Sequence, residues 1–260
     1  MSGKDEYYNR SKQEGYRSRA AYKLQQLDET ASLFEHGDTV VDLGAAPGGW
    51  LQVAAERVGV GGTVVGVDLQ RISDLEERDD AASVETIRGD MTDEKTKDRL
   101  RETIGDRGAN VVISDMAPNM TGEYNLDHAR SVHLARQAFE VALDLLAPGG
   151  DLIVKVFQGQ DLAALKDDIG DEFEYVRTVS PPASRDSSSE VYLIGKGRLN
   201  APVEEGDRLT VEIADVGEEG DGIAKRDGYT LFVPGTSEGE TVEVVVGDVK
   251  PNFGFAERVD

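Results

Sequence analysis

The 260-residue chain contains no cysteine, which excludes disulfide bonds, thiolate zinc sites and cysteine nucleophiles. It also lacks any apolar run near the ~18 residues of a membrane-spanning helix, and residues 1–10 lack the apolar segment of a secretory signal. Histidine is scarce, and His36, His128 and His133 are scattered along the sequence. We therefore expect a cytoplasmic protein that works without a metal ion.

Basic residues are also few, because 28 Lys and Arg stand against 51 Asp and Glu, a net charge of −23. A large negative net charge argues against broad contact with nucleic acid, whose phosphates are also negative. Residues 1–25, however, hold six Lys/Arg and three Asp/Glu, whereas residues 202–260 hold five and fifteen. The acidic residues are otherwise spread out, as on a halophilic protein whose self-repulsion is screened by high salt. We expect a halophilic source and unfolding at low salt.

Apolar segments and amphipathic segments alternate over residues 18–194. Strands are expected at 39–43, 63–69, 84–87, 110–114, 151–157, 174–179 and 191–194, and helices at 18–31, 50–58, 93–104, 126–146 and 160–169. This alternation predicts an α/β fold: a Rossmann-like, doubly wound sheet with helices on both faces. No helix fits between the last two strands, which predicts an antiparallel hairpin at one edge.

Three local features refine these boundaries. Residues 1–17 are polar and are expected to form a partly ordered arm. Ser18 is expected to cap the first helix. The sequence Pro148-Gly149-Gly150 is expected to end the helix over 126–146, as glycines commonly do at a helix C-terminus.

The character of the sequence changes after Gly197. We expect a first domain over 1–197, a linker over 198–206 and a second domain over 207–260. The second domain alternates turns rich in Gly and Asp with short strands at 209–213, 223–225, 230–233, 241–246 and 253–258. Five short strands without a helix predict a small β-barrel.

A glycine-rich turn with Gly44, Gly48 and Gly49 follows the strand at 39–43. In a doubly wound sheet, such a turn presents backbone N–H groups to a nucleotide-like ligand, and glycine allows close approach. The spacing is not the G-x-G-x-x-G of a dinucleotide site. With Asp68 ending the next strand, the pattern favours S-adenosylmethionine over NAD, with Gly44 and Gly48 at the cofactor site.

Two carboxylates and one aromatic residue are the other cofactor candidates. Asp68 is placed to accept both ribose hydroxyls, and Asp90, after the third strand, to accept the adenine amino group. Trp50 packs either beside the ligand or only against the sheet.

Lys155 interrupts an otherwise apolar strand, where a lysine is costly to bury unless it is paired. Asp115 directly follows another strand, Glu190 opens the last one, and Lys23 lies on the first helix. We expect these two lysines and two acids to form one cluster. Burial and a second ammonium favour a neutral amine, so Lys155 would take a proton from a substrate hydroxyl while Asp115 and Glu190 orient the groups.

Five motifs stand in a fixed order in this first domain: Arg-Ser-Arg-Ala-Ala-Tyr-Lys (17–23), Val-Asp-Leu-Gly-Ala-Ala-Pro-Gly-Gly-Trp (41–50), Ser-Asp-Met-Ala-Pro-Asn-Met (114–120), Val-Lys-Val-Phe-Gln-Gly (154–159) and Ser-Ser-Glu-Val-Tyr (188–192). Together they resemble the FtsJ/RlmE family of ribosomal RNA 2′-O-ribose methyltransferases over roughly residues 7–197.

This resemblance implies a catalytic tetrad of Lys23, Asp115, Lys155 and Glu190, with Lys155 as base or proton acceptor. It also implies cofactor contacts at Gly48, Trp50, Asp68, Asp90 and Asp115. The substrate it implies is a uridine ribose in large-subunit (23S) ribosomal RNA, methylated within an assembling particle. We expect an archaeal protein that acts as a monomer.

Residues 220–235 and Asn-Phe-Gly-Phe-Ala (252–256) resemble a TRAM domain, a small RNA-binding barrel that the bacterial form of the family lacks. Two groups of side chains are therefore expected to contact RNA. The first is the basic arm before Lys23, as a phosphate clamp: Arg10, Lys12, Arg17 and Arg19. The second is a basic and aromatic patch on the barrel: Lys225, Arg226, Tyr229, Phe232, Lys250 and Phe253.

Three alternatives stay open at this point. The same chemistry could act on tRNA or another RNA. A small-molecule methyltransferase would leave the arm and the barrel unexplained. A non-catalytic RNA-binding factor of ribosome assembly would be expected to have lost part of the tetrad, whereas all four positions are filled.

Overall fold

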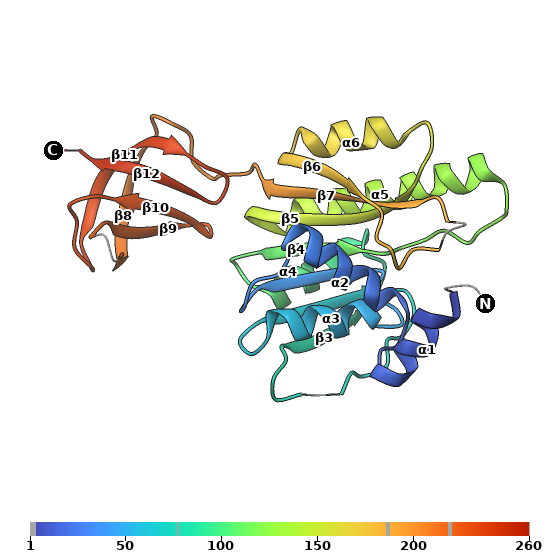
Figure 1. Cartoon of the computed structure of the whole chain (residues 1–260). Helices are drawn as coiled ribbons and strands as arrows, with labels where there is room; N and C mark the ends of the chain where they lie inside the picture. Colours follow the sequence, from blue (N-terminus) through green and yellow to red (C-terminus); the bar gives the residue numbers. More distant parts are fainter. Residues whose placement is uncertain (1–3, 77, 186–187, 218–219, 260) are drawn as a thin grey trace.

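The computed structural model describes residues 4–76, 78–185, 188–217 and 220–259 (Figure 1). Its larger part is a seven-stranded sheet in the order β3-β2-β1-β4-β5-β7-β6. Strands β1 to β5 are parallel to one another, whereas β7 is antiparallel to both β5 and β6. The strands are β1 (Thr39–Leu43), β2 (Thr63–Asp68), β3 (Ser83–Arg88), β4 (Ala109–Ser114), β5 (Leu146–Phe157), β6 (Phe173–Val179) and β7 (Glu190–Arg198). The predicted edge hairpin is confirmed.

Helices cover both faces of this sheet. On one face, α2 (Ala20–Ala31) and α3 (Gly49–Val58) bury their apolar sides; on the other lie α4 (Glu94–Ile104), α5 (Tyr124–Leu145) and α6 (Leu162–Gly170). In α2, Ala21, Leu24 and Leu27 recur at helical spacing and are fully buried. The doubly wound α/β architecture is therefore as predicted.

The strand order reverses between β1 and β4, which lie side by side in the sheet. The chain leaves β1 toward β2 and leaves β4 toward β5, in opposite directions. At such a point the connecting loops diverge, and ligands bind in the crevice at the carboxyl ends of the strands. This crevice is the place to look for the functional site.

The N-terminal arm differs from the expectation, because residues 4–14 form a helix, α1 (Lys4–Glu14). Contacts with α2 hold it: the Tyr7 and Tyr22 rings lie 5.4 Å apart between centroids, and the Tyr22 hydroxyl donates to Glu14 over 2.9 Å. Burial and the neighbouring carboxylate raise the pKa of Tyr22 to about 12. Tertiary contacts thus order a segment whose own sequence is too polar to predict a helix.

Two of the expected helix ends are wrong. Ser18 does not cap α2: the N-cap position is Arg19, and no side chain caps it. The helix α5 ends at Leu145, and Pro148-Gly149-Gly150 lies inside β5, where the pairing with β4 shifts register.

The C-terminal part is a closed barrel in the strand order β10-β12-β11-β8-β9. Its strands are β8 (Arg208–Val216), β9 (Gly222–Arg226), β10 (Tyr229–Val233), β11 (Thr241–Val249) and β12 (Phe253–Arg258). The barrel lies beside the start of β5, where Asn252 packs against Gly149. It is therefore at the end of the sheet opposite the crevice.

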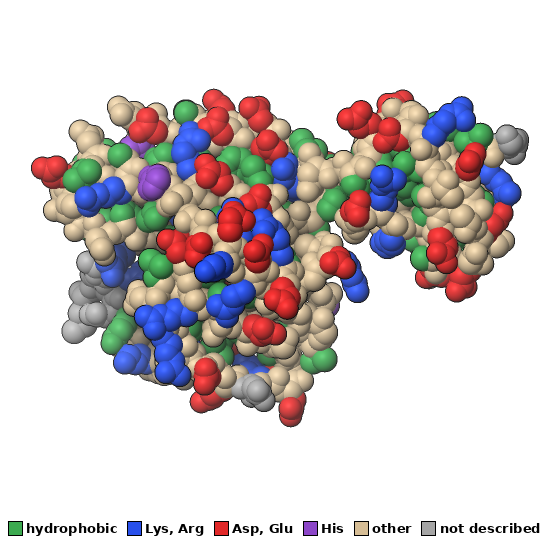
Figure 2. Space-filling view, turned by 180° about the vertical axis from the view of Figure 1, so that it is seen from behind, with side chains coloured by type: hydrophobic (Ala, Val, Ile, Leu, Met, Phe, Trp, Pro, Cys, Tyr) green, Lys and Arg blue, Asp and Glu red, His purple; other side chains and the backbone are tan. Residues whose placement is uncertain are grey.

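Acidic side chains are scattered over the sheet part and the barrel alike, with Lys and Arg among them, on the face that Figure 2 shows. Among the described residues, no helix is both long and apolar enough to cross a membrane.

Candidate active site

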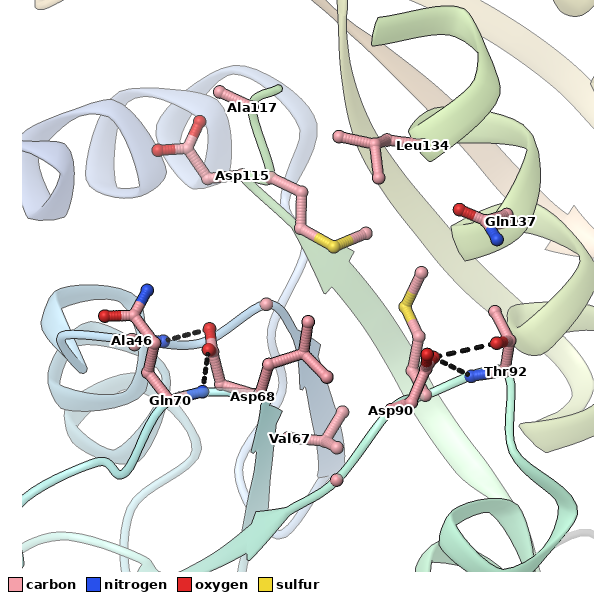
Figure 3. A pocket seen from close by; sticks show the side chains of 15 residues that line it. Ala46, Val67, Asp68, Gln70, Asp90, Thr92, Asp115, Ala117, Leu134 and Gln137 are labelled. Atoms are coloured by element: carbon pink, nitrogen blue, oxygen red, sulfur yellow. Dashed lines mark hydrogen bonds between the residues drawn. The ribbon is translucent and has the colours of Figure 1, made fainter. Parts of the chain in front are cut away.

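A cavity of about 370 Å³ opens at the carboxyl ends of β1, β2 and β4 (Figure 3). We call it the acidic cavity, because its lining includes Asp68, Asp90 and Asp115 and no Lys or Arg. The other lining residues are Gly44, Ala46, Val67, Leu69, Gln70, Gly89, Met91, Thr92, Met116, Ala117, Leu134 and Gln137. Three carboxylates around a partly apolar cavity fit a positively charged ligand with an apolar ring.

Backbone hydrogen bonds fix two of these carboxylates. Asp68 accepts the N–H of Ala46 at 3.0 Å and that of Gln70 at 2.7 Å. Asp90 accepts from the N–H and the hydroxyl of Thr92, at 2.9 and 2.7 Å, and these bonds lower the pKa of Asp90. Because a carboxylate has about four lone-pair sites, both side chains keep acceptor capacity for hydroxyl or amino groups of a ligand.

The three glycines of the turn have different surroundings. Gly44 lines the acidic cavity, and a Cβ there would lie 2.1 Å from the Met116 side chain. A Cβ on Gly48, whose φ is +103°, would lie 3.0 Å from the Arg17 guanidinium, and one on Gly49 would lie 2.4 Å from the Ser18 hydroxyl. Gly48 and Gly49 thus make room for residues 17–18.

Arg17 uses its guanidinium to join two loops of the protein. It donates to the carbonyls of Pro47 at 3.1 Å and of Ser73 and Asp74 at 2.6 Å each. Its own N–H donates to Gln52 at 2.8 Å. In the structure Arg17 thus holds together the two loops that contribute Ala46 and Gln70 to the acidic cavity, whereas the expected role was a phosphate contact.

Trp50 is buried outside the acidic cavity. Its indole N–H donates to the Ala20 carbonyl at 2.8 Å, and its ring centroid lies 5.8 Å from that of Tyr192. The indole therefore packs against the sheet and α2. A cofactor contact from Trp50 would have to come from its backbone N–H, since the first amides of a helix lack intrahelical partners.

The structure brings together the four residues of the predicted cluster. The Lys155 ammonium donates to the Asp115 carboxylate at 2.8 Å and also to the Asp115 carbonyl. The Lys23 ammonium lies 2.7 Å from the Glu190 carboxylate and 3.9 Å from that of Asp115. Lys23, Lys155 and Glu190 are each buried.

Asp115 is the centre of this cluster. Burial opposes its ionisation, but the ammonium groups of Lys155 and Lys23 outweigh burial, so the pKa of Asp115 is lowered. The Tyr192 hydroxyl donates to the same carboxylate oxygen at 2.6 Å. Tyr192 is a site residue that the sequence pattern did not single out. It lies two residues after Glu190, hence on the same face of the strand, and this spacing was the available signal.

A second cavity, of about 530 Å³, lies on the other side of the cluster. We call it the basic cavity, because Arg19, Lys23, Lys155 and Arg185 line it against only two acids, Asp127 and Glu190. Its remaining lining residues are Ala20, Ala117, Met120, Gly122, Tyr124, His128, Phe157, Ser188 and Ser189. The acidic and basic cavities share Ala117, two residues after Asp115.

Residues 16–198 match the FtsJ-like methyltransferase family, and residues 202–259 match the TRAM domain. The chain belongs to the FtsJ-like methyltransferases. A relative from Halorubrum lacusprofundi is 72% identical over the whole of this chain and 95% of its own length. One from Natronomonas pharaonis is 66% identical over the full length of both. Both are named ribosomal RNA large subunit methyltransferase E, and both come from halophilic archaea.

This FtsJ-like methyltransferase also resembles a solved structure, a Plasmodium falciparum protein assigned as a ribosomal RNA methyltransferase. The TM-score is 0.62 at 27% identity, over 71% of this chain and all of the other. The predicted family and fold are thus confirmed.

The arm residues of this FtsJ-like methyltransferase are engaged in different ways. Arg10 pairs with Glu14 at 2.7 Å, and the Lys12 ammonium lies 5.4 Å from the centre of the Tyr8 ring. Arg19 donates to the Ala183 carbonyl at 2.6 Å and lines the basic cavity. Of the four expected arm contacts, Arg19 is the one that lines the basic cavity.

The barrel patch is partly different from the expectation. Tyr229 is fully buried and donates to the Lys250 carbonyl, so it belongs to the barrel core. Phe232 and Phe253 lie on the outer surface together with Phe255, with ring centroids 5.6–5.8 Å apart. The basic members are exposed: Lys225 donates to Thr230, Lys250 pairs with Asp248 at 3.0 Å, and Arg226 follows on β9.

Two buried polar residues lie near the cluster. Asp42 is buried with one carboxylate oxygen unpartnered; burial, together with the charges of Asp115 and Asp68, raises the pKa of Asp42 well above its usual range. His128 contacts the Phe157 carbonyl at 3.0 Å and the Asp161 N–H at 3.2 Å. In the described part of the chain, no group of three His, Asp or Glu is arranged to hold a metal ion.

Proposed function

We propose that this protein is an S-adenosylmethionine-dependent methyltransferase that modifies the 2′-hydroxyl of a uridine in large-subunit (23S) ribosomal RNA. The observation that carries the proposal is the junction of the two cavities at Asp115, which lines the acidic cavity and pairs with both lysines of the basic cavity. The names of the two relatives support ribosomal RNA as the substrate.

The acidic cavity fits S-adenosylmethionine by the chemistry of its lining. The cofactor carries positive charge on its sulfonium and amino groups, and the cavity offers three carboxylates. Asp68 would accept the ribose hydroxyls, Asp90 the adenine amino group and Asp115 the amino group of the methionine part. Gly44 and Gly48 would shape the turn beside the cofactor, since their own N–H groups donate to the carbonyls of Val67 and Ala45. The N-terminus of α3 would bring the free backbone amides. When bound, the cofactor supplies a methyl group that passes to an oxygen nucleophile.

Lys155 would accept the proton of that hydroxyl. Its ammonium is held by two oxygens of Asp115, and Asp115 is in turn held by the Tyr192 hydroxyl. Lys23, paired with Glu190, places a second positive charge beside Asp115. Lys155 would take the proton in its neutral amine form. The proton would leave Lys155 for solvent through the open basic cavity.

The basic cavity would take the RNA, with Arg19 and Arg185 near its phosphates. On the barrel, Phe232, Phe253 and Phe255 would stack on unpaired bases beside Lys225 and Arg226, a mode of binding that tolerates any base. The barrel lies at the far end of the sheet (Figure 1), so these contacts would involve RNA remote from the methylated ribose.

We further propose domain boundaries at 1–197, 198–206 and 207–260, and a monomer in the cytoplasm. The two family matches and the first barrel strand at Arg208 support the boundaries.

The test is to incubate the protein with methyl-labelled S-adenosylmethionine and large ribosomal subunits that lack the modification, and to map the label. We expect one 2′-O-methyluridine in 23S RNA. Label in tRNA alone would favour another RNA substrate, and label on free nucleosides or metabolites a small-molecule enzyme. Intact RNA binding without any transfer would favour a non-catalytic assembly factor.

A further inference from the structure

The basic cavity has an exposed tyrosine on its wall. Tyr124, the first residue of α5, is 60% exposed. The two other rings on this lining among the described residues, those of Phe157 and His128, are buried. A large aromatic face that stays open beside Lys155 and Lys23 needs an explanation, because its exposure adds nothing to the stability of the fold.

The Tyr124 ring is held in place from two sides. Its hydroxyl donates to the Gln158 carbonyl at 2.7 Å, just after β5. The loop before it is fixed by Asp127, which accepts from the N–H and hydroxyl of Thr121 at 2.8 and 2.9 Å and from the N–H of Gly122 at 3.0 Å. These bonds lower the pKa of Asp127. The ring is thus anchored to the two chain segments that carry Asp115 and Lys155.

A ribose hydroxyl can reach Lys155 only if its nucleotide enters the basic cavity, and a nucleotide stacked inside a helix must turn out to do so. Its base then needs a new stacking partner. We propose that Tyr124 is this partner: its ring stacks on the base of the target nucleotide and so holds the 2′-hydroxyl at Lys155. This inference rests on the proposed function. Because an aromatic ring can stack on any base, Tyr124 would position the target nucleotide without selecting its base.

The experiment compares two RNA fragments that contain the mapped methylation site. One carries the normal nucleotide, and the other an abasic ribose with an intact 2′-hydroxyl at that position. Methyl transfer is measured as kcat/KM for the wild type, Tyr124→Ala and Tyr124→Phe. Tyr175→Ala is the matched control, because Tyr175 is 48% exposed on the edge strand β6, away from both cavities.

On the normal fragment we expect Tyr124→Ala to lose about 10-fold in kcat/KM, the scale of one base–aromatic stack. Tyr124→Phe, which keeps the ring, should lose less, and Tyr175→Ala should match the wild type. On the abasic fragment, the wild type and Tyr124→Ala should have the same kcat/KM, because the stacking partner is gone. Unchanged affinity for S-adenosylmethionine would show that each variant is folded.

An equal loss by Tyr124→Ala on both fragments would overturn the proposal, as would no loss on the normal fragment. Failure of the wild type to methylate any ribose would instead overturn the proposed function itself. The two failures are therefore distinguishable.

Discussion

The acidic and basic cavities share one lining residue, Ala117, and differ in the charge of the side chains that line them. The first has three carboxylates and no cation, and the second has four cations against two acids, one of which, Asp127, is occupied within its own loop. In a chain of net charge −23, such a concentration of cations is local and cannot be read from the total. The comparison teaches that the local charge of a cavity, and not the charge of the chain, indicates which ligand it accepts.

Lys155→Met should have the largest effect, because it removes the amine at the junction of the two cavities and leaves an apolar side chain of similar length. We expect the single-turnover rate of methyl transfer to fall about 10²–10⁴-fold, the range of general acid–base catalysis. The affinity for S-adenosylmethionine, measured by calorimetry, should change little.

Lys196→Met is the matched control for this variant. Lys196, on β7, also pairs with a buried aspartate, Asp151 on β5, four residues along that strand from Lys155 and toward its start. It should alter stability and leave the methyl-transfer rate near that of the wild type. A near-wild-type rate in Lys155→Met would reject the role of Lys155.

Asp68→Asn should weaken the acidic cavity alone. It removes a charge that accepts two backbone N–H bonds and that would accept the ribose hydroxyls. Hydrogen bonds to charged groups contribute about 1.5–3 kcal/mol, so the Kd for S-adenosylmethionine should rise about 10–100-fold. RNA affinity should stay the same, and the exposed Asp79→Asn should change neither. A loss of RNA affinity in Asp68→Asn would show that the two cavities are not separate sites.

Arg17→Lys should have a smaller effect, on the cofactor side only. A lysine cannot replace the three carbonyl contacts that join the glycine turn to the loop after β2. At about 1 kcal/mol for each lost bond that is not replaced, we expect the KM for S-adenosylmethionine to rise about 3–10-fold. If Arg17 contacted a phosphate instead, Arg17→Gln, which removes the charge, would reduce the salt dependence of RNA binding, and that result would support the phosphate clamp. Lys12→Gln is the control within the arm.

Asp42→Asn should affect activity least and should change how stability depends on pH. Because its pKa in the folded protein is raised, Asp42 keeps its proton at pH values where the unfolded chain has lost it. The contribution of Asp42 to the free energy of unfolding therefore falls as pH rises above about 4, by up to about 1.4 kcal/mol per pH unit, until the folded pKa is passed. Denaturant unfolding of wild type and variant at constant high salt should show that this falling contribution is missing from the variant. If the free energy of unfolding depends on pH in the same way in the wild type and in Asp42→Asn, Asp42 is not protonated in the folded protein.

The sheet, the barrel and the tetrad could be predicted because their signals are local. Lys155 is conspicuous as a charge inside an apolar strand, and the elements around it alternate regularly. The cost of burying an unpaired lysine was enough to predict its acidic partners. Tyr192 was missed because an aromatic residue in a strand is ordinary core material in most sheets.

The arm, Arg17 and Tyr124 could not be predicted because their partners are distant in the sequence. Arg17 meets Ser73 and Asp74 only after the β2 loop folds back over the glycine turn. Helix α1 depends on rings and carboxylates of α2. For Tyr124, at the start of α5, nothing in the sequence distinguishes a ligand contact from an ordinary exposed tyrosine.

The most direct test of the account is a crystal structure of the protein with S-adenosylhomocysteine and an RNA fragment that contains the mapped site. We expect the cofactor product in the acidic cavity at Asp68 and Asp90, and the target 2′-oxygen in the basic cavity within hydrogen-bond distance of the Lys155 amine. A target ribose bound away from Lys155, or a cofactor product outside the acidic cavity, would contradict the account.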